Sequence, residues 1–180
     1  MAVLTSLTPD DLLTLPKPQD GKHYELSRGE LIVVGNAGAR HERVKRQILK
    51  LLFAYEAQNP IGPVFSESQF TLADGGARIP DVAFVGNAKL AGLPDADVAI
   101  PFAPDLAIEI ISGSETAAGA ESKIQEYLSS GVQEAWQIYP NERRVRVRTR
   151  DAIRDYAGNE SLETPVLPGF HLRVSDLFNR

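Results

Sequence analysis

Two acidic residues lie within or beside apolar stretches that resemble buried strands. Glu109 is in the middle of the run Leu-Ala-Ile-Glu-Ile-Ile, and Asp81 opens the run Pro-Asp-Val-Ala-Phe-Val at 80–85. An ionised carboxylate in a buried strand is costly unless it is paired, hydrogen-bonded or bound to a metal. Because the same-face neighbours of Glu109 are apolar, we favour a functional role over a solvated strand face. Taken alone, Asp81 is better explained as a solvated aspartate at a strand end.

Together the two acids suggest a cation site with a basic partner. Carboxylates on neighbouring strands are hard oxygen ligands for Mg²⁺ or Mn²⁺, with water completing the coordination. On the predicted helix 117–130, Lys123 lies about 90° from the centre of the apolar face and within about 40° of Tyr127. Lys123 is therefore a candidate for the positive group. The alternative, a lysine that extends along apolar surface to water, is the commoner case for a single flanking lysine.

A histidine and a set of arginines are further candidates. His41 projects near the middle of the apolar face of the predicted helix 41–58, so it is either a site neighbour or a histidine at the core edge. Alternation in the strand 142–150 puts arginines on one face and valines on the other. That basic face could dock nucleic-acid phosphates, or it could be the solvated outer face of an edge hairpin. Its candidate residues for nucleic-acid binding are Arg144, Arg146 and Arg148.

The elements that must position these residues follow from hydrophobic periodicity and from Gly and Pro punctuation. We predict helices at 8–15, 41–58 and 117–130, an N-terminal hairpin at 24–26 and 30–34, strands at 64–72, 79–85 and 106–111, a second hairpin at 134–139 and 142–150, and a short segment at 174–178. This order predicts an α/β or α+β fold with a mixed sheet flanked by helices.

Composition limits the class of protein. The 180 residues are 43% hydrophobic and 24% charged, which is typical of one globular domain over 1–180. We expect a cytoplasmic protein with no membrane partner, because no apolar run, signal peptide or cysteine indicates otherwise. The net charge of -5 argues against a protein that simply coats nucleic acid. A local basic stripe together with bound cations could still meet a phosphate backbone.

The order of the candidate residues resembles the Uma-type putative restriction endonuclease family of bacterial proteins. The similarity runs nearly end to end, and single pieces are weaker than the ordered set. Its pieces are Asp11-Leu12-Leu13, Leu15-Pro16, Tyr24-Glu25-Leu26, Gly29-Glu30-Leu31, His41, Arg78, Pro80-Asp81, Pro104-Asp105-Leu106, Glu109, Lys123, Tyr127, Gly131 to Trp136, and Leu167-Pro168-Gly169-Phe170.

The resemblance implies a restriction-endonuclease-like core of the PD-(D/E)XK nuclease superfamily. In that core Asp81, Glu109 and the carbonyl of Ile110 would hold a divalent cation, while Lys123 attends the attacked phosphate and Tyr127 positions the lysine. The parent motif has its lysine two residues after the acid, where this chain has isoleucine, so the resemblance implies a lysine moved to the following helix. The sequence also has Ser-Gly-Ser at 112–114, where the family tends to have Ser-Pro-Ser.

We therefore predict an endonuclease that hydrolyses DNA phosphodiester bonds with Mg²⁺ or Mn²⁺. A homodimer is expected, since two symmetric sites cut both strands of a duplex most simply. The alternative is a catalytically inactive module that keeps the nuclease fold and binds nucleic acid or a protein partner. Binding of Mn²⁺ would separate the two, because an interaction module has no reason to keep an acidic pair with a lysine.

Overall fold

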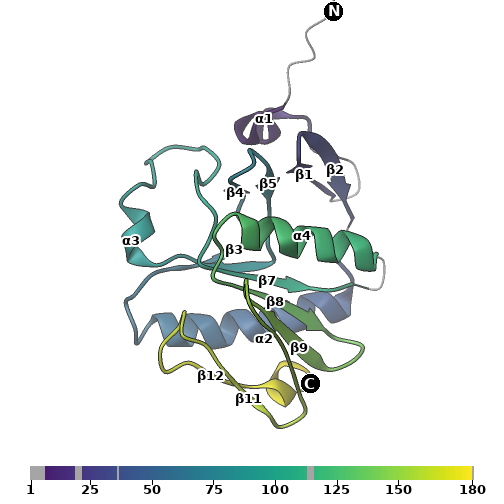
Figure 1. The fold of residues 1–180 in the computed structure, drawn as a ribbon, viewed down its shortest axis with the longest axis vertical. Coiled ribbons are helices and arrows are strands. Elements are labelled where there is room, and N and C mark those ends of the chain that lie inside the picture. Colours follow the sequence, from purple (N-terminus) through teal and green to yellow (C-terminus); the bar gives the residue numbers. More distant parts are fainter. Residues whose placement is uncertain (1–6, 19–21, 36, 113–115, 180) are drawn as a thin grey trace, which may run out of the picture.

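A computed structural model describes residues 7–18, 22–35, 37–112 and 116–179 (Figure 1). Its helices are α1 (Pro9–Thr14), α2 (Ala39–Glu56), α3 (Asn87–Leu90), α4 (Ala117–Ser129) and the 3-10 helix η1 (Val174–Leu177). Its strands are β1 (His23–Ser27), β2 (Glu30–Val34), β3 (Val64–Ser66), β4 (Phe70–Thr71), β5 (Ala77–Arg78), β6 (Val82–Phe84), β7 (Leu106–Ile110), β8 (Glu134–Tyr139), β9 (Arg144–Arg148), β10 (Ile153–Ala157), β11 (Ser161–Glu163) and β12 (His171–Arg173).

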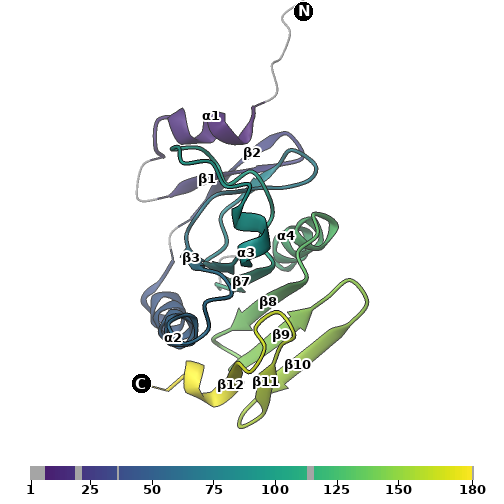
Figure 2. The ribbon, with the colours of Figure 1, turned by 90° about the vertical axis from the view of Figure 1, so that its left-hand side faces the viewer.

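The centre of the fold is a mixed sheet between two helices. Within the described residues its strands follow the order β10-β9-β8-β7-β6-β3. Strands β7 and β8 are parallel, whereas the other neighbours in this sheet are antiparallel. Helix α2 covers one face and α4 the other, as the view from the side shows (Figure 2). The predicted α+β architecture, a mixed sheet flanked by helices, is confirmed.

The two faces of β7 carry different kinds of side chain. Ile108 and its even-numbered neighbours join the large apolar cluster beneath α2, together with Trp136 of β8. Ala107 joins the smaller cluster beneath α4, with Ala135 of β8. Because alanine side chains are short, the helix lies close to this face. Residues of α4 can therefore reach Glu109, which follows Ala107 on the same face.

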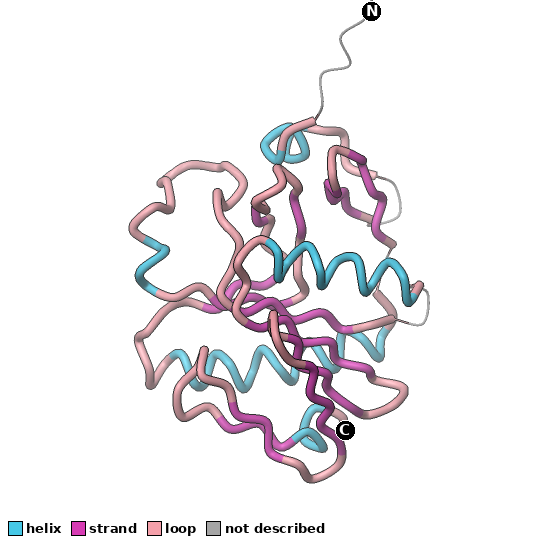
Figure 3. The backbone as a smooth tube through the Cα atoms, viewed as in Figure 1, coloured by secondary structure: helices cyan, strands magenta, loops and turns pink. Residues whose placement is uncertain are grey.

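The N-terminal hairpin belongs to a second sheet, with strand order β2-β1-β5-β4. In the view of Figure 3 these strands lie above α4. Ser27 pairs with Glu30 across a two-residue turn. Arg28 and Gly29 form that turn with φ values of 49° and 83°, the left-handed conformation that tight hairpins require. The predicted hairpin is confirmed, and it places β1 beside β5, the strand that precedes Asp81.

Two predicted strands are wrong as single elements. The run 64–72 divides into β3 in the central sheet and β4 in the second sheet. The run 79–85 begins only at Val82 as β6, while β5 lies upstream in the other sheet. Pro80 interrupts this run because proline has no N–H to donate to a ladder. Asp81 thus lies where the chain passes from one sheet to the other.

Several elements were not predicted, namely α3, β5, β10, β11 and β12. Strand β10 pairs with β9, so the arginine-bearing strand is interior rather than at the edge of the sheet. The departure from the family at 112–114 falls largely on residues 113–115, which lie outside the described residues. No helix in the described part of the chain is long and apolar enough to cross a bilayer.

Candidate active site

The two predicted acids lie at the same end of neighbouring strands in the central sheet. Strands β6 and β7 are antiparallel, with Val82 opposite Ile108. Asp81 immediately precedes β6, so continuing that register by one residue puts its backbone opposite Glu109. The side chain of Asp81 contacts β7 and α2, whereas that of Glu109 lies beneath α4. The charge of Asp81 contributes to the raised pKa of Glu109, so the structure brings together acids that are 28 positions apart in the sequence.

Asp81 is fixed by the backbone of β7 and by α2. The N–H of Ile110 donates a hydrogen bond to its Oδ2 atom at 2.7 Å. His41 Nε2 lies 3.1 Å from the same oxygen, so the predicted supporting histidine does contact the acid. Burial opposes protonation of His41, but the hydrogen bond and charge of Asp81 outweigh it and raise the pKa of the imidazole.

Glu109 is buried beneath α4 with two contacts on one oxygen. The phenol of Tyr127 donates to Oε1 at 2.6 Å, and the ammonium nitrogen of Lys123 is 3.0 Å from the same atom. Burial raises the pKa of Glu109 to about 8; Asp81 and Glu25 add to the rise and Lys123 opposes it. The pKa of this carboxyl therefore lies closer to neutral pH than that of an ordinary glutamate.

Lys123 does not extend to water. Its residue is only 8% exposed, and its ammonium lies between two carboxylates, 3.0 Å from Glu109 and 2.9 Å from Glu25. Burial would lower the pKa of Lys123, but the two carboxylates raise it above its ordinary value and keep the group charged. The phenol of Tyr127 donates to the same Glu109 oxygen that Lys123 contacts, and a role of Tyr127 in positioning Lys123 stays a prediction.

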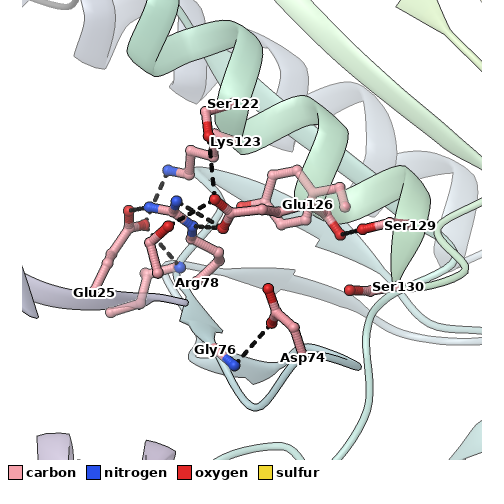
Figure 4. A network of polar contacts seen from close by, with 12 residues as sticks. Glu25, Asp74, Gly76, Arg78, Ser122, Lys123, Glu126, Ser129 and Ser130 are labelled. Carbon is pink, nitrogen blue, oxygen red and sulfur yellow. Dashed lines mark hydrogen bonds and ion pairs between the residues drawn. The ribbon is translucent and has the colours of Figure 1, made fainter. Parts of the chain in front are cut away.

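The sequence by itself does not indicate the role of Glu25. In the sequence this residue is only one piece of the family pattern, yet in the structure it is 1% exposed and touches Lys123. Its second oxygen accepts from Arg78 at 2.8 Å, and Arg78 reaches Glu126 on its other side (Figure 4). An acid and a base in separate short strands leave no signal of pairing in the sequence, because the contact spans 53 positions.

The charges around the site do not balance. Three acids, Glu25, Glu109 and Glu126, contact the two permanent cations Arg78 and Lys123, and Asp81 contacts His41. When all four acids are ionised, two negative charges are left over if His41 is neutral and one if it is protonated. A buried excess of this kind is unfavourable, and proton uptake by Glu109 relieves it when no cation is present.

The donor set fits a hard cation that keeps several waters. Among the described residues no group of three or more histidine, aspartate or glutamate side chains forms a ready-made metal cage. Mg²⁺, however, is typically bound by only one or two carboxylates. Gln137 adds a neutral oxygen beside them: it pairs with Glu109 in the β7–β8 register, is 2% exposed, and its Oε1 has no hydrogen-bond partner in the described part of the chain.

The arginines of β9 lie on the same face as Glu109 but are already paired. Arg146 makes two bonds of 2.8 Å to Asp155, and Arg148 contacts Glu121 at 2.7 and 2.9 Å. Arg144 also reaches Asp155 and stacks over the ring of Tyr139. A phosphate at this stripe would compete with these carboxylates.

Comparison with known proteins supports a nuclease-like fold. A family model, Uma2, described as "Putative restriction endonuclease", matches residues 9–175. A crystal structure from Anabaena variabilis ATCC 29413, described as a putative nuclease belonging to DUF820, is similar with a TM-score of 0.81 and 22% sequence identity, over 96% of this chain and 97% of that one. At that identity the likeness establishes the fold alone. No curated protein matches the sequence.

Proposed function

We propose that this chain, which belongs to the Uma2 family of putative restriction endonucleases, is a metal-dependent endonuclease that hydrolyses DNA phosphodiester bonds. The observation that carries the proposal is the ion pair of Lys123 with Glu109 at 3.0 Å beneath α4, with Asp81 immediately before the neighbouring strand β6. Two neighbouring acids with an adjoining lysine are a set of groups that can support metal-assisted phosphodiester hydrolysis.

Asp81, Glu109 and the carbonyl of Ile110 would hold Mg²⁺ or Mn²⁺. When bound, the cation would polarise the phosphate and lower the pKa of an attacking water. Glu109 must lose its proton to serve as a ligand, and Lys123 favours that loss because it lies 3.0 Å away and stays positively charged. Tyr127 and His41 each hold one oxygen of one acid, which would leave the other oxygen of each carboxylate for the cation.

Lys123 would act on the substrate through its charge. A protonated ammonium in a buried site stabilises negative charge that develops on the phosphate oxygens, and it costs little reorganisation because it is already held in place. Its pKa is raised by its two carboxylate neighbours, so it is a donor rather than a base at neutral pH. Orientation of the water and stabilisation of the phosphate are both compatible with a donor at this position.

The substrate and the assembly follow from the same site. We infer duplex DNA cut by a homodimer, because two symmetric sites reach both strands. The arginine face of β9 extends across the sheet from Glu109 through Gln137 to Arg146, so it would meet the backbone of a substrate held at the acids. Its ion pairs with Asp155 must exchange for phosphate contacts.

One observation favours a second candidate, a nuclease-fold module that binds without cutting. Each of Arg144, Arg146 and Arg148 is neutralised by an acidic partner, and no group of three metal-binding side chains forms among the described residues. An inactive copy would keep such a closed, self-paired site.

Cleavage of supercoiled plasmid with and without Mg²⁺ or Mn²⁺ separates the two candidates. We expect nicked and linear products that vanish with a chelator, and loss of both in Asp81→Asn and Glu109→Gln. Gln133→Met is the matched control, since it removes a side-chain amide that bonds Asp105 away from the site. Intact plasmid from all proteins, with Mn²⁺ binding absent in calorimetry, would establish the non-catalytic module.

A further inference from the structure

The N-terminal hairpin contributes a buried carboxylate to the site from outside the central sheet. Glu25 of β1 is 1% exposed. Its Oε1 accepts a hydrogen bond from the N–H of Ile79 at 3.0 Å and lies 2.9 Å from the Lys123 ammonium. Ile79 is two residues before Asp81 in the sequence. One oxygen atom therefore touches both the candidate lysine and the segment that leads to a candidate metal ligand.

A second set of contacts locks this carboxylate in place. Arg78 donates to Glu25 Oε2 at 2.8 Å and to Glu126 Oε2 through Nε at 2.8 Å. The other oxygen of Glu126 accepts from the hydroxyls of Ser27 and Ser122 at 2.7 and 3.3 Å. The network joins the hairpin, the strand before Asp81 and helix α4 (Figure 4).

A connection between these elements that served stability alone would not need buried charged groups. Buried ion pairs seldom stabilise a protein more than apolar residues of the same volume would. Apolar side chains, however, could not fix the position of the Lys123 ammonium. A lysine side chain has a flexible four-carbon stem, so its nitrogen is placed only by acceptors on more than one side. Glu109 is one acceptor and Glu25 is the other.

We propose that Glu25 is a positioning residue of the nuclease site. It would hold the Lys123 ammonium in place when the carboxylate of Glu109 binds a cation. The inference rests on the proposed function, because Glu109 and Lys123 are the groups being positioned. Glu126 provides an internal comparison. It belongs to the same buried network and binds the same arginine, but its contacts do not include Lys123.

The test compares Glu25→Gln with Glu126→Gln. Both replace a buried carboxylate of Arg78 by an amide of the same shape, so both should lower the melting temperature. We expect a slowly exchanging Lys123 ammonium signal in ¹⁵N–¹H spectra of the wild type, assigned by its loss in Lys123→Met. The signal should broaden beyond detection in Glu25→Gln and persist in Glu126→Gln. In plasmid cleavage, kcat should fall about tenfold or more in Glu25→Gln, with KM little changed.

The two readouts separate failure of the inference from failure of the function. An unchanged Lys123 signal in Glu25→Gln, or equal loss in both variants, would overturn the positioning role whether or not the protein cuts DNA. If the wild type does not cleave DNA and the signal is lost only in Glu25→Gln, the proposed nuclease activity is rejected. The role of Glu25 in positioning Lys123 is then still supported. If Glu25→Gln does not fold, Glu25→Asp replaces it, because the shorter acid keeps its charge for Arg78 but withdraws from Lys123.

Discussion

Each face of the central sheet is covered by a helix, but the two faces carry very different side chains. Beneath α2, Ile108, Trp136 and Ile138 pack into one apolar cluster with the helix and the C-terminal strands. Beneath α4, Glu109 and Gln137 occupy the corresponding strands, and the helix supplies Lys123. The α2 face supplies stability through buried apolar area. The α4 face holds excess negative charge, which costs stability and is useful only if a cation binds.

The largest effect should come from truncating the apolar face. Ile108→Ala removes a fully buried side chain from the α2 cluster and should lower the free energy of unfolding by about 2–5 kcal/mol. Urea denaturation measures it. Any Mn²⁺ affinity of the folded fraction should be unchanged. A loss below about 1 kcal/mol would show that the apolar face beneath α2 is not the main source of stability.

Removal of the lysine should affect chemistry more than folding. Lys123→Met keeps the buried stem, while Glu25 retains Arg78 and Glu109 can hold a proton, so the variant should fold. Metal-dependent cleavage should fall by a factor on the order of 10²–10³, since a preorganised charge at the phosphate is lost. Single-turnover plasmid cleavage is the measurement, with Lys89→Met as a control on the remote Asp105 pair. Cleavage at the wild-type rate would remove Lys123 from the mechanism.

A bound cation should offset the loss of stability that the excess negative charge beneath α4 causes. Mn²⁺ at a hundred times its dissociation constant should stabilise the wild type by about 2.7 kcal/mol, seen as a higher melting temperature. Glu109→Gln removes a charge but keeps the shape, so without metal it should be no less stable, and its melting temperature should ignore Mn²⁺. A destabilised variant, beside a wild type that also ignores Mn²⁺, would instead indicate a structural ion pair.

The proton on Glu109 should make both stability and Mn²⁺ binding depend on pH. Its pKa in the folded protein is about 8 against an ordinary 4.5, so the folded state binds the extra proton between these values. The folded state should therefore lose stability as pH rises through that window. Mn²⁺ affinity should rise about tenfold per pH unit up to about 8 and then level off, because binding releases the proton.

Glu109→Gln is the control for this pH dependence. It should lose the part of the stability slope that comes from Glu109 while keeping the part due to His41, whose pKa is also raised. Calorimetric titrations with Mn²⁺ at pH 6 to 9 and urea denaturation over the same range are the measurements. An Mn²⁺ affinity that does not vary with pH would mean that Glu109 is already ionised in the protein without metal.

The smallest effect should come from the paired arginines. Arg146→Gln breaks a partly exposed ion pair with Asp155, so the change in stability should be within about 1 kcal/mol. If the stripe docks DNA, binding should weaken and the slope of log affinity against log salt should fall by about one. Arg154→Gln, on the opposite face of the same hairpin, is the matched control. Equal binding by both variants would place the DNA contacts elsewhere.

Local patterns in the sequence were enough for the main helices, for the N-terminal hairpin and for Glu109. Helical periodicity predicted α2 and α4, the turn at Gly29 predicted the hairpin, and the cost of a carboxylate in an apolar run singled out Glu109. These features depend on residues a few positions apart. Asp81 and Lys123 needed the ordered family pattern as well, since each has an ordinary explanation when taken alone.

Only the tertiary structure decided which charges meet. The run around Asp81 divides between two sheets at Pro80, and this division brings Glu25 of the hairpin to Lys123. Strand β10 places an acid opposite Arg146, so the predicted basic stripe is neutralised. Pairing between strands is set by packing over the whole fold rather than by neighbours in the chain. The sequence therefore determined the chemical groups and their elements, while the long-range register determined the partner and hence the charge state of each group.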